Sequence, residues 1–423
     1  MKPRVLILGA DGFIGRHIAF GLRARGYDVV ASARKTDRLT TMGFEVLQAD
    51  LTDPRLHTAS GWAPHVTGVT HVVNAAGVLH ASKAVMSAVH VDAPRALYTA
   101  LSRDAHGVLI SAVGIEAGTD FAHFRQNGEK VAKAAHLTIL RPGLVLGDTS
   151  YGGSSLGRAL AAFPLATPLI GGGSQPINPI HVDDLSACVS ELLEQAPHDK
   201  PLEIGGAQTL TQAEMLTGYR KWFGLRPVRG ISIPASWATR LGRLGDILHM
   251  GPISATAVAQ LNVSLIADDS ATRSHLNIQP RGFSEFVWSR PAGTQDLWQA
   301  RLYLIKPLLR LSLALLWIAS ACVGLFLPST AFLPIFAQTG LPDGLLLTLA
   351  RGGGIIDLFI GIALLRNWRP QTTAWMQIGM VGGYTLGLTL LSPSLWALPF
   401  GGLLKNIPIL VLLLIHLALV EER

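Results

Sequence analysis

The stretch VLILGADGFIG, at residues 5–15, decides the fold of the first half of the chain. Its four leading apolar residues are typical of a parallel strand that is buried on both faces. Glycines at the spacing G-x-x-G-x-x-G follow at once, and an amphipathic helix is expected from there to about Arg25. A strand, a glycine-rich turn and a helix in this order predict a loop that binds the pyrophosphate of a dinucleotide. An ordinary tight turn is the alternative.

Further short apolar runs predict more strands of the same kind, and helical stretches separate them. The predicted strands cover residues 27–31, 44–48, 71–74, 108–110 and 137–140. This alternation predicts an α/β fold with a Rossmann-type, doubly wound parallel sheet, and a small substrate subdomain is expected at about 150–230. In such sheets ligands bind at the carboxyl ends of the strands.

The residues expected to hold the cofactor follow those strand ends. Arg34 stands where a site for NAD usually has an acidic residue, so its charge favours NADP(H) over NAD(H), although a solvated surface arginine is the alternative. Asp50 is expected to accept a hydrogen bond from the adenine amino group. The predicted cofactor-binding residues are Gly9, Asp11, Gly12, Phe13, Ile14, Gly15, Arg34, Asp50, Leu51, Asn74, Ala75, Ala76, Gly77, Asn127, Pro142 and Gly143.

Taken together, several motifs resemble the atypical and extended short-chain dehydrogenase/reductase superfamily. They are Gly9–Gly15, Asp50-Leu51, Asn74–Gly77, Ser111, Arg141-Pro142-Gly143 and IHVDDL at 180–185. Within the superfamily they look most like the NAD(P)-binding relatives of the complex I accessory-subunit type. The resemblance covers about residues 1–290 and implies chemistry by a Tyr-x-x-x-Lys helix and a serine. In that chemistry the tyrosine transfers a proton, and the lysine lowers the tyrosine pKa and holds the ribose.

This chain lacks the Tyr-x-x-x-Lys pair, because no tyrosine is followed by a lysine four residues later. Judged by the distance to Arg141, His123 falls near the tyrosine position and Asn127 near the lysine position. His123 is therefore a candidate acid/base, with a surface histidine as the alternative. Asn127 cannot supply the positive charge. Ser111 matches the serine and is a candidate to position a carbonyl oxygen, unless strand packing alone requires a small residue there.

Composition separates the last third of the chain from the rest. Charged residues make up 15% of the 423 residues, against about 25% in an average soluble protein. Only 12 charges fall within residues 301–423, 8 Lys/Arg and 4 Asp/Glu. No run rich in Lys and Arg is present, so nothing predicts nucleic-acid binding. Cys188 and Cys322 are far apart in sequence, which gives no metal-type cysteine spacing and no metal prediction.

Four apolar segments in this last third predict an all-α, four-helix transmembrane bundle. They lie at about 303–326, 344–365, 372–391 and 397–419, each near the roughly 20 residues that a span needs. In length, span count and fusion context they are similar to the DoxX-like membrane family.

The distribution of Lys and Arg predicts the orientation of these spans. Arg301, Lys306 and Arg310 flank the start of the first span, while Arg366 and Arg369 follow the second. The other two loops carry neither residue type. By the positive-inside rule both termini and the first domain are cytoplasmic, as in a bacterial-type inner membrane.

Three ionisable residues fall inside or near the predicted spans, namely Arg351, Asp357 and Lys405. Asp357 falls in the second span and Lys405 in the fourth. Because an unpaired charge is costly in lipid, we expect the two to form an interhelical ion pair.

The domains expected from these features are a Rossmann-type domain at 1–230, a helical connector at 231–300 and the membrane domain at 301–423. The connector has helical patterns at 235–248 and 255–265.

The leading functional hypothesis is an NADP(H)-dependent oxidoreductase. It would act on a small or lipid-soluble carbonyl or quinone-type compound at the cytoplasmic face of the bilayer. The alternative is a non-catalytic, structural or redox-sensing subunit that binds NADP(H) and a membrane protein partner. Nucleotide-sugar epimerisation or dehydration ranks lower, because it needs the missing tyrosine and lysine.

Overall fold

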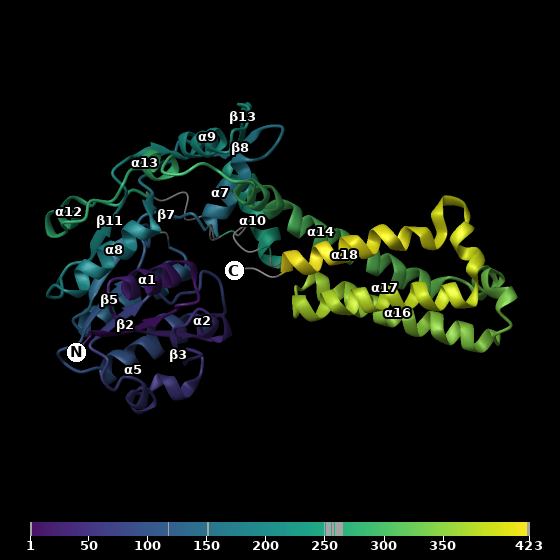
Figure 1. Cartoon of the computed structure of the whole chain (residues 1–423), viewed down its shortest axis with the longest axis horizontal. Helices are drawn as coiled ribbons and strands as arrows, with labels where there is room; N and C mark the ends of the chain where they lie inside the picture. The colour runs from purple at the N-terminus through teal and green to yellow at the C-terminus, as the bar shows by residue number, and fades with distance from the viewer. Residues whose placement is uncertain are drawn as a thin grey trace. The chain divides into compact units, whose positions relative to one another are not determined.

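The computed structural model describes residues 2–116, 118–149, 152–248, 250, 255, 258 and 265–420. Contacts divide the chain into two units (Figure 1). The first unit comprises Met1–Gly245 and Gly251–Ala300, and the second comprises Asp246–Met250 and Arg301–Arg423. The helix predicted at 255–265 lies almost wholly outside the described residues.

A seven-stranded sheet with the order β11-β6-β5-β4-β1-β2-β3 forms the centre of the first unit. Every neighbouring pair is parallel, which confirms the predicted Rossmann-type sheet. The seventh strand, which the sequence did not predict, joins the edge beside β6. The strands are β1 (Arg4–Leu8), β2 (Asp28–Ala33), β3 (Glu45–Gln48), β4 (His71–Asn74), β5 (His106–Ile110), β6 (Thr138–Pro142) and β11 (Leu202–Ile204).

Helices cover both faces of this sheet. In Figure 1, α1 and α8 lie on one side of the strands and α5 on the other. Each face has its own cluster of buried apolar side chains. The helices of this part are α1 (Phe13–Ala24), α2 (Asp37–Thr41), α3 (Ala59–Trp62), α4 (Lys83–Ser87), α5 (Ala93–Ala100), α6 (Asp120–Ala134) and α8 (Val182–Leu193), with a π-helical turn, η3 (Ala88–Asp92), before α5.

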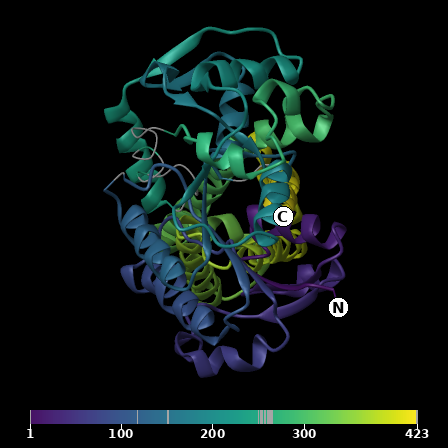
Figure 2. The same ribbon diagram turned by 90° about the vertical axis from the view of Figure 1, so that its left-hand side faces the viewer.

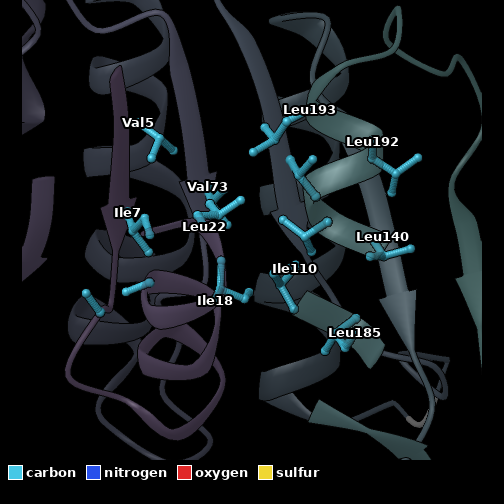
Figure 3. Close-up of a cluster of buried hydrophobic side chains, with 14 of the residues drawn as sticks. Val5, Ile7, Ile18, Leu22, Val73, Ile110, Leu140, Leu185, Leu192 and Leu193 are labelled. Atoms are coloured by element: carbon cyan, nitrogen blue, oxygen red, sulfur yellow. The ribbon is translucent and has the colours of Figure 1, made fainter. Parts of the chain in front are cut away.

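The apolar face of α1 explains why the glycine-rich loop is held rigidly. Ile18 and Leu22, four residues apart, are fully buried against the strands. Figure 3 shows them pointing into the same layer as Val5 and Ile7 of β1, with Leu185 of α8 across from them. Each such side chain contributes roughly 1.5–3 kcal/mol by leaving water. The start of α1 is therefore fixed relative to the end of β1.

Most residues after β6, apart from α8 and β11, add a second layer to the first unit, drawn in teal to green above the purple and blue sheet in Figures 1 and 2. A third apolar cluster holds this layer together, with Tyr219 and Trp222 of α9 among its members. Its elements are β7 (Val145–Leu146), α7 (Gly153–Ala161), β8 (Thr167–Ile170), β9 (Pro176–Ile177), β10 (Ile180–His181), β12 (Leu210–Thr211), α9 (Gln212–Trp222), β13 (Gly230–Ile233), α10 (Ala235–Ile247) and α13 (Phe283–Val287). Helix α12 (Ser270–His275) packs against β11 of the sheet instead.

The second unit is helical. Its long helices are α14 (Thr294–Phe326, which begins in the first unit), α16 (Asp343–Leu365), α17 (Pro370–Leu391) and α18 (Asn406–Val420). Shorter elements join them: α15 (Ser329–Phe332) and the 3₁₀ turns η5 (Leu333–Thr339), η6 (Pro393–Ala397) and η7 (Pro399–Lys405).

Among the described residues, three helical segments are long and apolar enough to cross a membrane. They are Thr294–Phe326, Asp343–Leu365 and Gly401–Val420. These agree with three of the four predicted spans. The remaining one, predicted at 372–391, forms the helix α17 but is not among the three, and it includes buried polar residues such as Thr373 and Gln377.

The predicted ion pair between Asp357 and Lys405 is wrong. Asp357 is buried and accepts hydrogen bonds from Ser320 Oγ of α14 (2.6 Å) and from the Tyr384 hydroxyl of α17 (3.1 Å). Lys405 is exposed at the end of η7, and no ion pair joins these two described side chains. Hydroxyl groups on the neighbouring helices satisfy the carboxyl group, so it needs no cation.

Candidate functional site

The β1–α1 loop has a shape that only glycine permits. Gly9 has a φ of +74°, and the Gly12 amide donates to the Gly9 carbonyl oxygen at 3.0 Å. A Cβ atom at Gly15 would lie 2.2 Å from that same oxygen, and one at Gly9 would lie 2.8 Å from the Ala76 backbone. The turn, the start of α1 and the segment after β4 are therefore in direct backbone contact. A dinucleotide pyrophosphate needs this kind of bare backbone surface.

The N-terminus of α1 supplies the charge that such a ligand needs. The helix begins at Phe13 with no acidic residue in its first turn, so its free N–H groups and dipole favour an anion. Asp11, one residue before the Gly12 N-cap, has its Oδ2 3.9 Å from Arg38 Nη2. The other oxygen of Asp11 is buried and accepts no hydrogen bond from the described part of the chain. The predicted residues of the loop thus fit a dinucleotide.

Three cations follow β2 within five residues. Arg34 and Lys35 are exposed at the strand end, and Arg38 stands one turn later on α2. Next to them, Asp50 accepts hydrogen bonds from the Thr52 amide (3.0 Å) and hydroxyl (2.8 Å). These two bonds, and then the charge of Arg34, lower the pKa of Asp50. Sequence reasoning found Arg34 but missed Arg38, which lies four residues further on, in the first turn of α2.

The end of β4 is shaped by Asn74, which is buried. Its Oδ1 accepts from the Ala76 amide at 3.1 Å, and its Nδ2 donates to the Tyr98 hydroxyl at 2.8 Å. The Ala75 amide donates to the Leu8 carbonyl oxygen at 3.0 Å. Both polar ends of the Asn74 side chain are therefore engaged within the protein. Asn74 fixes the loop over which a cofactor would lie, and Ala75 and Ala76 leave that loop bare.

A different part of α6 from the predicted one meets this loop. Arg125 Nη1 lies 3.4 Å from the Ala76 carbonyl oxygen, and a Cβ atom at Gly77 would lie 2.7 Å from Arg125 Nη2. The guanidinium group also sits 5.6 Å from the ring centre of Phe121, one helical turn earlier. Burial lowers the pKa of Arg125 to about 10. Phe121 and Arg125 are four residues apart, which is the spacing of the expected tyrosine and lysine.

His90 closes the same corner from the π-helical turn η3. Its Nε2 lies 3.0 Å from the Val78 carbonyl oxygen, and its ring packs edge-on against Phe121. Burial, and then the charge of Arg125, lower the pKa of His90 to about 4. His90 is thus a neutral, buried histidine at neutral pH. Its place beside Gly77 could not be read from sequence, because a π-helical turn has no clear sequence signal.

The predicted pair His123 and Asn127 lies elsewhere on α6. His123 is exposed, and its Nε2 is 3.1 Å from Asn127 Nδ2. Asn127 Oδ1 in turn accepts from Lys130 Nζ at 3.2 Å. A shift of two residues turns a helix by about 200°, so these side chains point away from the face of Phe121 and Arg125. The structure brings His123 and Asn127 together but not to the loop at Ala76. Their functional roles stay predictions.

Ser111 belongs to a buried network. Its hydroxyl donates to Glu129 Oε1 at 2.5 Å, and Glu129 also accepts from Arg141 Nε (2.8 Å) and Nη2 (2.6 Å). The hydrogen bond to Glu129 is the main cause of the raised pKa of Arg141. The network ties together β5, α6 and β6, and it engages the proton of the Ser111 hydroxyl.

Pro142 and Gly143 mark the passage from the sheet to the second layer. Pro142 pairs with Ile204 of β11, and the Gly143 amide donates to the Ile204 carbonyl oxygen at 2.9 Å. A Cβ atom at Gly143 would lie 3.3 Å from the Asn178 carbonyl oxygen. The strand thus continues through the proline. A role for the two residues beside the nicotinamide stays a prediction.

Comparison with known proteins finds one matching family for a segment in each part of the chain. Residues 5–112 match the model of the NAD dependent epimerase/dehydratase family, and residues 314–414 match that of the DoxX-like family. The chain joins an epimerase/dehydratase-type domain to a DoxX-like domain. The epimerase match ends just before α6, which is where the Tyr-x-x-x-Lys pair is missing.

One curated protein is similar in sequence to part of the chain. UDP-glucuronate 4-epimerase 1 of Arabidopsis thaliana is 32% identical over 98 residues, which are 20% of this chain and 23% of that protein. The chain therefore matches less than a quarter of the length of this curated relative.

Solved structures are similar over a longer stretch. The UDP-glucuronic acid 4-epimerase from Bacillus cereus in complex with NAD matches with a TM-score of 0.52 and 16% identity over 71% of this chain and 99% of its own. The dTDP-4-dehydrorhamnose reductase from Bacillus anthracis in complex with NADP matches with a TM-score of 0.53 and 15% identity over 68% and 98%. At such identity the likeness shows the fold alone. That fold supports the binding of a nicotinamide dinucleotide.

Proposed function

We propose that the protein is a membrane-anchored oxidoreductase that uses NADP(H) to reduce a lipid-soluble carbonyl or quinone-type compound. The observation that carries the proposal is Arg125, a desolvated cation beside the cofactor loop at Ala76 and Gly77. No ion pair within the described ranges involves its guanidinium group. When bound, the dinucleotide supplies the hydride. Arg125 stabilises the negative charge that develops on the acceptor oxygen, and water then protonates that oxygen.

The preference for NADP(H) rests on charge. Arg34, Lys35 and Arg38 follow β2, and a guanidinium group among them would bind a 2′-phosphate. Arg38 is the best placed of the three, because it also lies near Asp11 in the β1–α1 loop.

The membrane part would tether the first unit to the bilayer in which lipid-soluble acceptors dissolve. The DoxX-like domain and three apolar helices suggest membrane association. We propose that α17 spans the bilayer as well and that both termini are cytoplasmic, because Lys and Arg concentrate on that side. The soluble domain then meets its acceptor at the cytoplasmic surface.

A second candidate is a non-catalytic subunit that binds NADP(H) and a membrane protein partner. It is favoured by the engagement of Ser111 with Glu129 and by the phenylalanine at position 121. Nucleotide-sugar epimerisation is the activity in the names of several relatives. It ranks below both, because the described face of α6 that meets the loop at Ala76 offers neither tyrosine nor lysine.

The test uses the full-length protein in detergent or reconstituted in vesicles. Calorimetry should show NADPH binding about tenfold tighter than NADH, and Arg38→Gln should weaken NADPH alone. NADPH oxidation with an added long-chain quinone or aldehyde should occur. It should fall about 100-fold in Arg125→Met and be partly kept in Arg125→Lys. Lys130→Met, on the exposed face of α6, is the matched control.

The outcomes separate the candidates. Tight binding without oxidation of NADPH by any acceptor supports the non-catalytic subunit. Interconversion of UDP-glucuronate and UDP-galacturonate supports an epimerase. Failure to bind either dinucleotide contradicts all three.

A further inference from the structure

Helix α10 (Ala235–Ile247) turns large apolar side chains outward. Trp237, Leu241, Leu244 and Ile247 are between 49% and 71% exposed. Their spacing of four, three and three residues places them on successive turns along one side of the helix. The buried residues of α10 are Ala238, Gly242 and Gly245. The helix thus packs through its small residues and exposes its large ones, which is the reverse of a helix that faces water.

One basic residue lies within this apolar stripe and another lies at its edge. Arg240 and Arg243 are both exposed, and the Arg240 guanidinium group lies 5.9 Å from the ring centre of Trp237. Asp246, the one acidic residue of α10, is only half-exposed. Tryptophan and leucine on one side with arginine at its edge is the pattern of a helix that lies in the plane of a membrane interface. In that position arginine reaches the headgroups while its stem covers apolar surface.

A hydrogen bond holds the residue after α10 at the point where α14 loses its charged residues. The carbonyl oxygen of Leu248, directly after α10, accepts a hydrogen bond from Arg310 of α14. Both residues belong to the second unit. Arg310 is the last charge of α14 before the uncharged stretch 311–342. The polar headgroups of a bilayer are expected at this boundary, so α10 ends where the headgroups begin.

We propose that α10 is an interfacial helix whose exposed stripe inserts into the bilayer surface. Trp237, Leu241, Leu244 and Ile247 would lie at the boundary between headgroups and acyl chains, and Arg240 and Arg243 would bind anionic lipid phosphates. A membrane is favoured over a protein partner because Leu248, directly after the stripe, is hydrogen-bonded to a helix long and apolar enough to cross a membrane, and because the stripe carries the charges that anionic lipid attracts. The inference is independent of the dinucleotide site and stands or falls without it.

The test places a bimane probe on Leu241→Cys in full-length protein with a Cys322→Ser background, reconstituted in vesicles with about one-third anionic lipid. Brominated acyl chains should quench the probe at least about twofold more than aqueous iodide does. A probe on Lys221→Cys, exposed on α9, is the matched control and should show the reverse order. Arg240→Gln with Arg243→Gln should reduce the difference between anionic and zwitterionic vesicles.

Two results would overturn the proposal. Equal quenching by iodide at positions 241 and 221 would place α10 in water. Shielding from both quenchers, already present in detergent, would mean that a second copy or another protein covers the stripe. Because the probe replaces one exposed side chain, the fold can be checked separately by the melting temperature of the labelled protein.

Discussion

The β1–α1 loop and the inner face of α6 both contact the segment at Ala76 after β4, yet the sequence determines them very differently. At the loop, backbone atoms touch backbone atoms, and only glycine is possible at Gly9 and Gly15. At α6, the face toward Ala76 carries Phe121 and Arg125, and the fold places no comparable restriction on their identity. The backbone frame of the loop is therefore fixed, while the side chains beside it can vary. A fold match reports on the first and says little about the second.

The largest expected effect tests the loop. Gly9 and Gly43 have nearly the same φ, +74° and +75°, but a Cβ atom would clash with Ala76 at Gly9 and would meet open space at Gly43. Gly43→Ala should cost only the strain of the left-handed conformation, about 1–2 kcal/mol. Gly9→Ala should cost about 3–5 kcal/mol in the free energy of unfolding and abolish dinucleotide binding. Thermal unfolding and calorimetry measure both, and equal behaviour of the two variants would refute the steric argument.

The next prediction tests whether Ser111 acts through Glu129. Glu129→Gln should lower the free energy of unfolding by about 3 kcal/mol, because it removes the buried charge nearest to Arg141 and leaves only the more distant Glu116 and Glu203. Ser111→Ala should cost about 1 kcal/mol in the wild-type background and much less in Glu129→Gln. Additive costs in this double-mutant cycle would mean that the two side chains do not interact. They would leave Ser111 free to bind a substrate oxygen.

Sequence alone predicted most of the sheet and the loop, for physical reasons that also explain the failures. Buried parallel strands can be recognised as apolar runs in the sequence. Strand β11 was missed because it is only three residues long and has Glu203 at its centre. The glycine motif can be recognised from its own residues, without knowing which segment packs against it. On α6, by contrast, the position of the expected pair was inferred from its distance to Arg141. An error of two residues there selects the opposite face of the helix.

The partners of Asp357 in the second unit were also not predictable from the sequence. The sequence shows that Asp357 needs a partner, but not which one. Its hydroxyl partners come from α14 and α17, and their proximity depends on how the helices pack. The packing of the helices gives Asp357 neutral hydroxyl donors, whereas the sequence predicted an ion pair with Lys405.

His90, which packs beside Arg125, should make the stability of the protein depend on pH. The pKa of His90 is about 4 in the folded protein, against about 6.5 when unfolded. As pH falls from 6.5 toward 4, the unfolded chain binds a proton that the folded protein resists, so stability is lost in this range and is fully present above it. At 1.36 kcal/mol per pKa unit the loss reaches about 3 kcal/mol. His90→Asn should flatten this part of the melting-temperature profile.

The control for the pH experiment is His65→Asn, a change at an exposed histidine of the same domain. Its melting temperature should follow the wild-type profile from pH 4 to pH 8. Parallel profiles for the wild type and His90→Asn would show that His90 is not desolvated beside Arg125, and the packing of that corner would need revision.

The smallest expected effect concerns the residue that the sequence singled out for acid/base chemistry. His123 is exposed and its ring nitrogen contacts only Asn127 among the hydrogen bonds of the described residues, about 200° around α6 from Arg125. His123→Ala should change the free energy of unfolding by less than about 0.5 kcal/mol and leave NADPH binding and oxidation unaltered. Asn127→Ala should behave in the same way. A tenfold loss of turnover at unchanged affinity in His123→Ala alone would show that this side chain reaches the acceptor. The group that transfers the proton would then lie on the outer face of α6, and Arg125 would not be the residue that faces the acceptor.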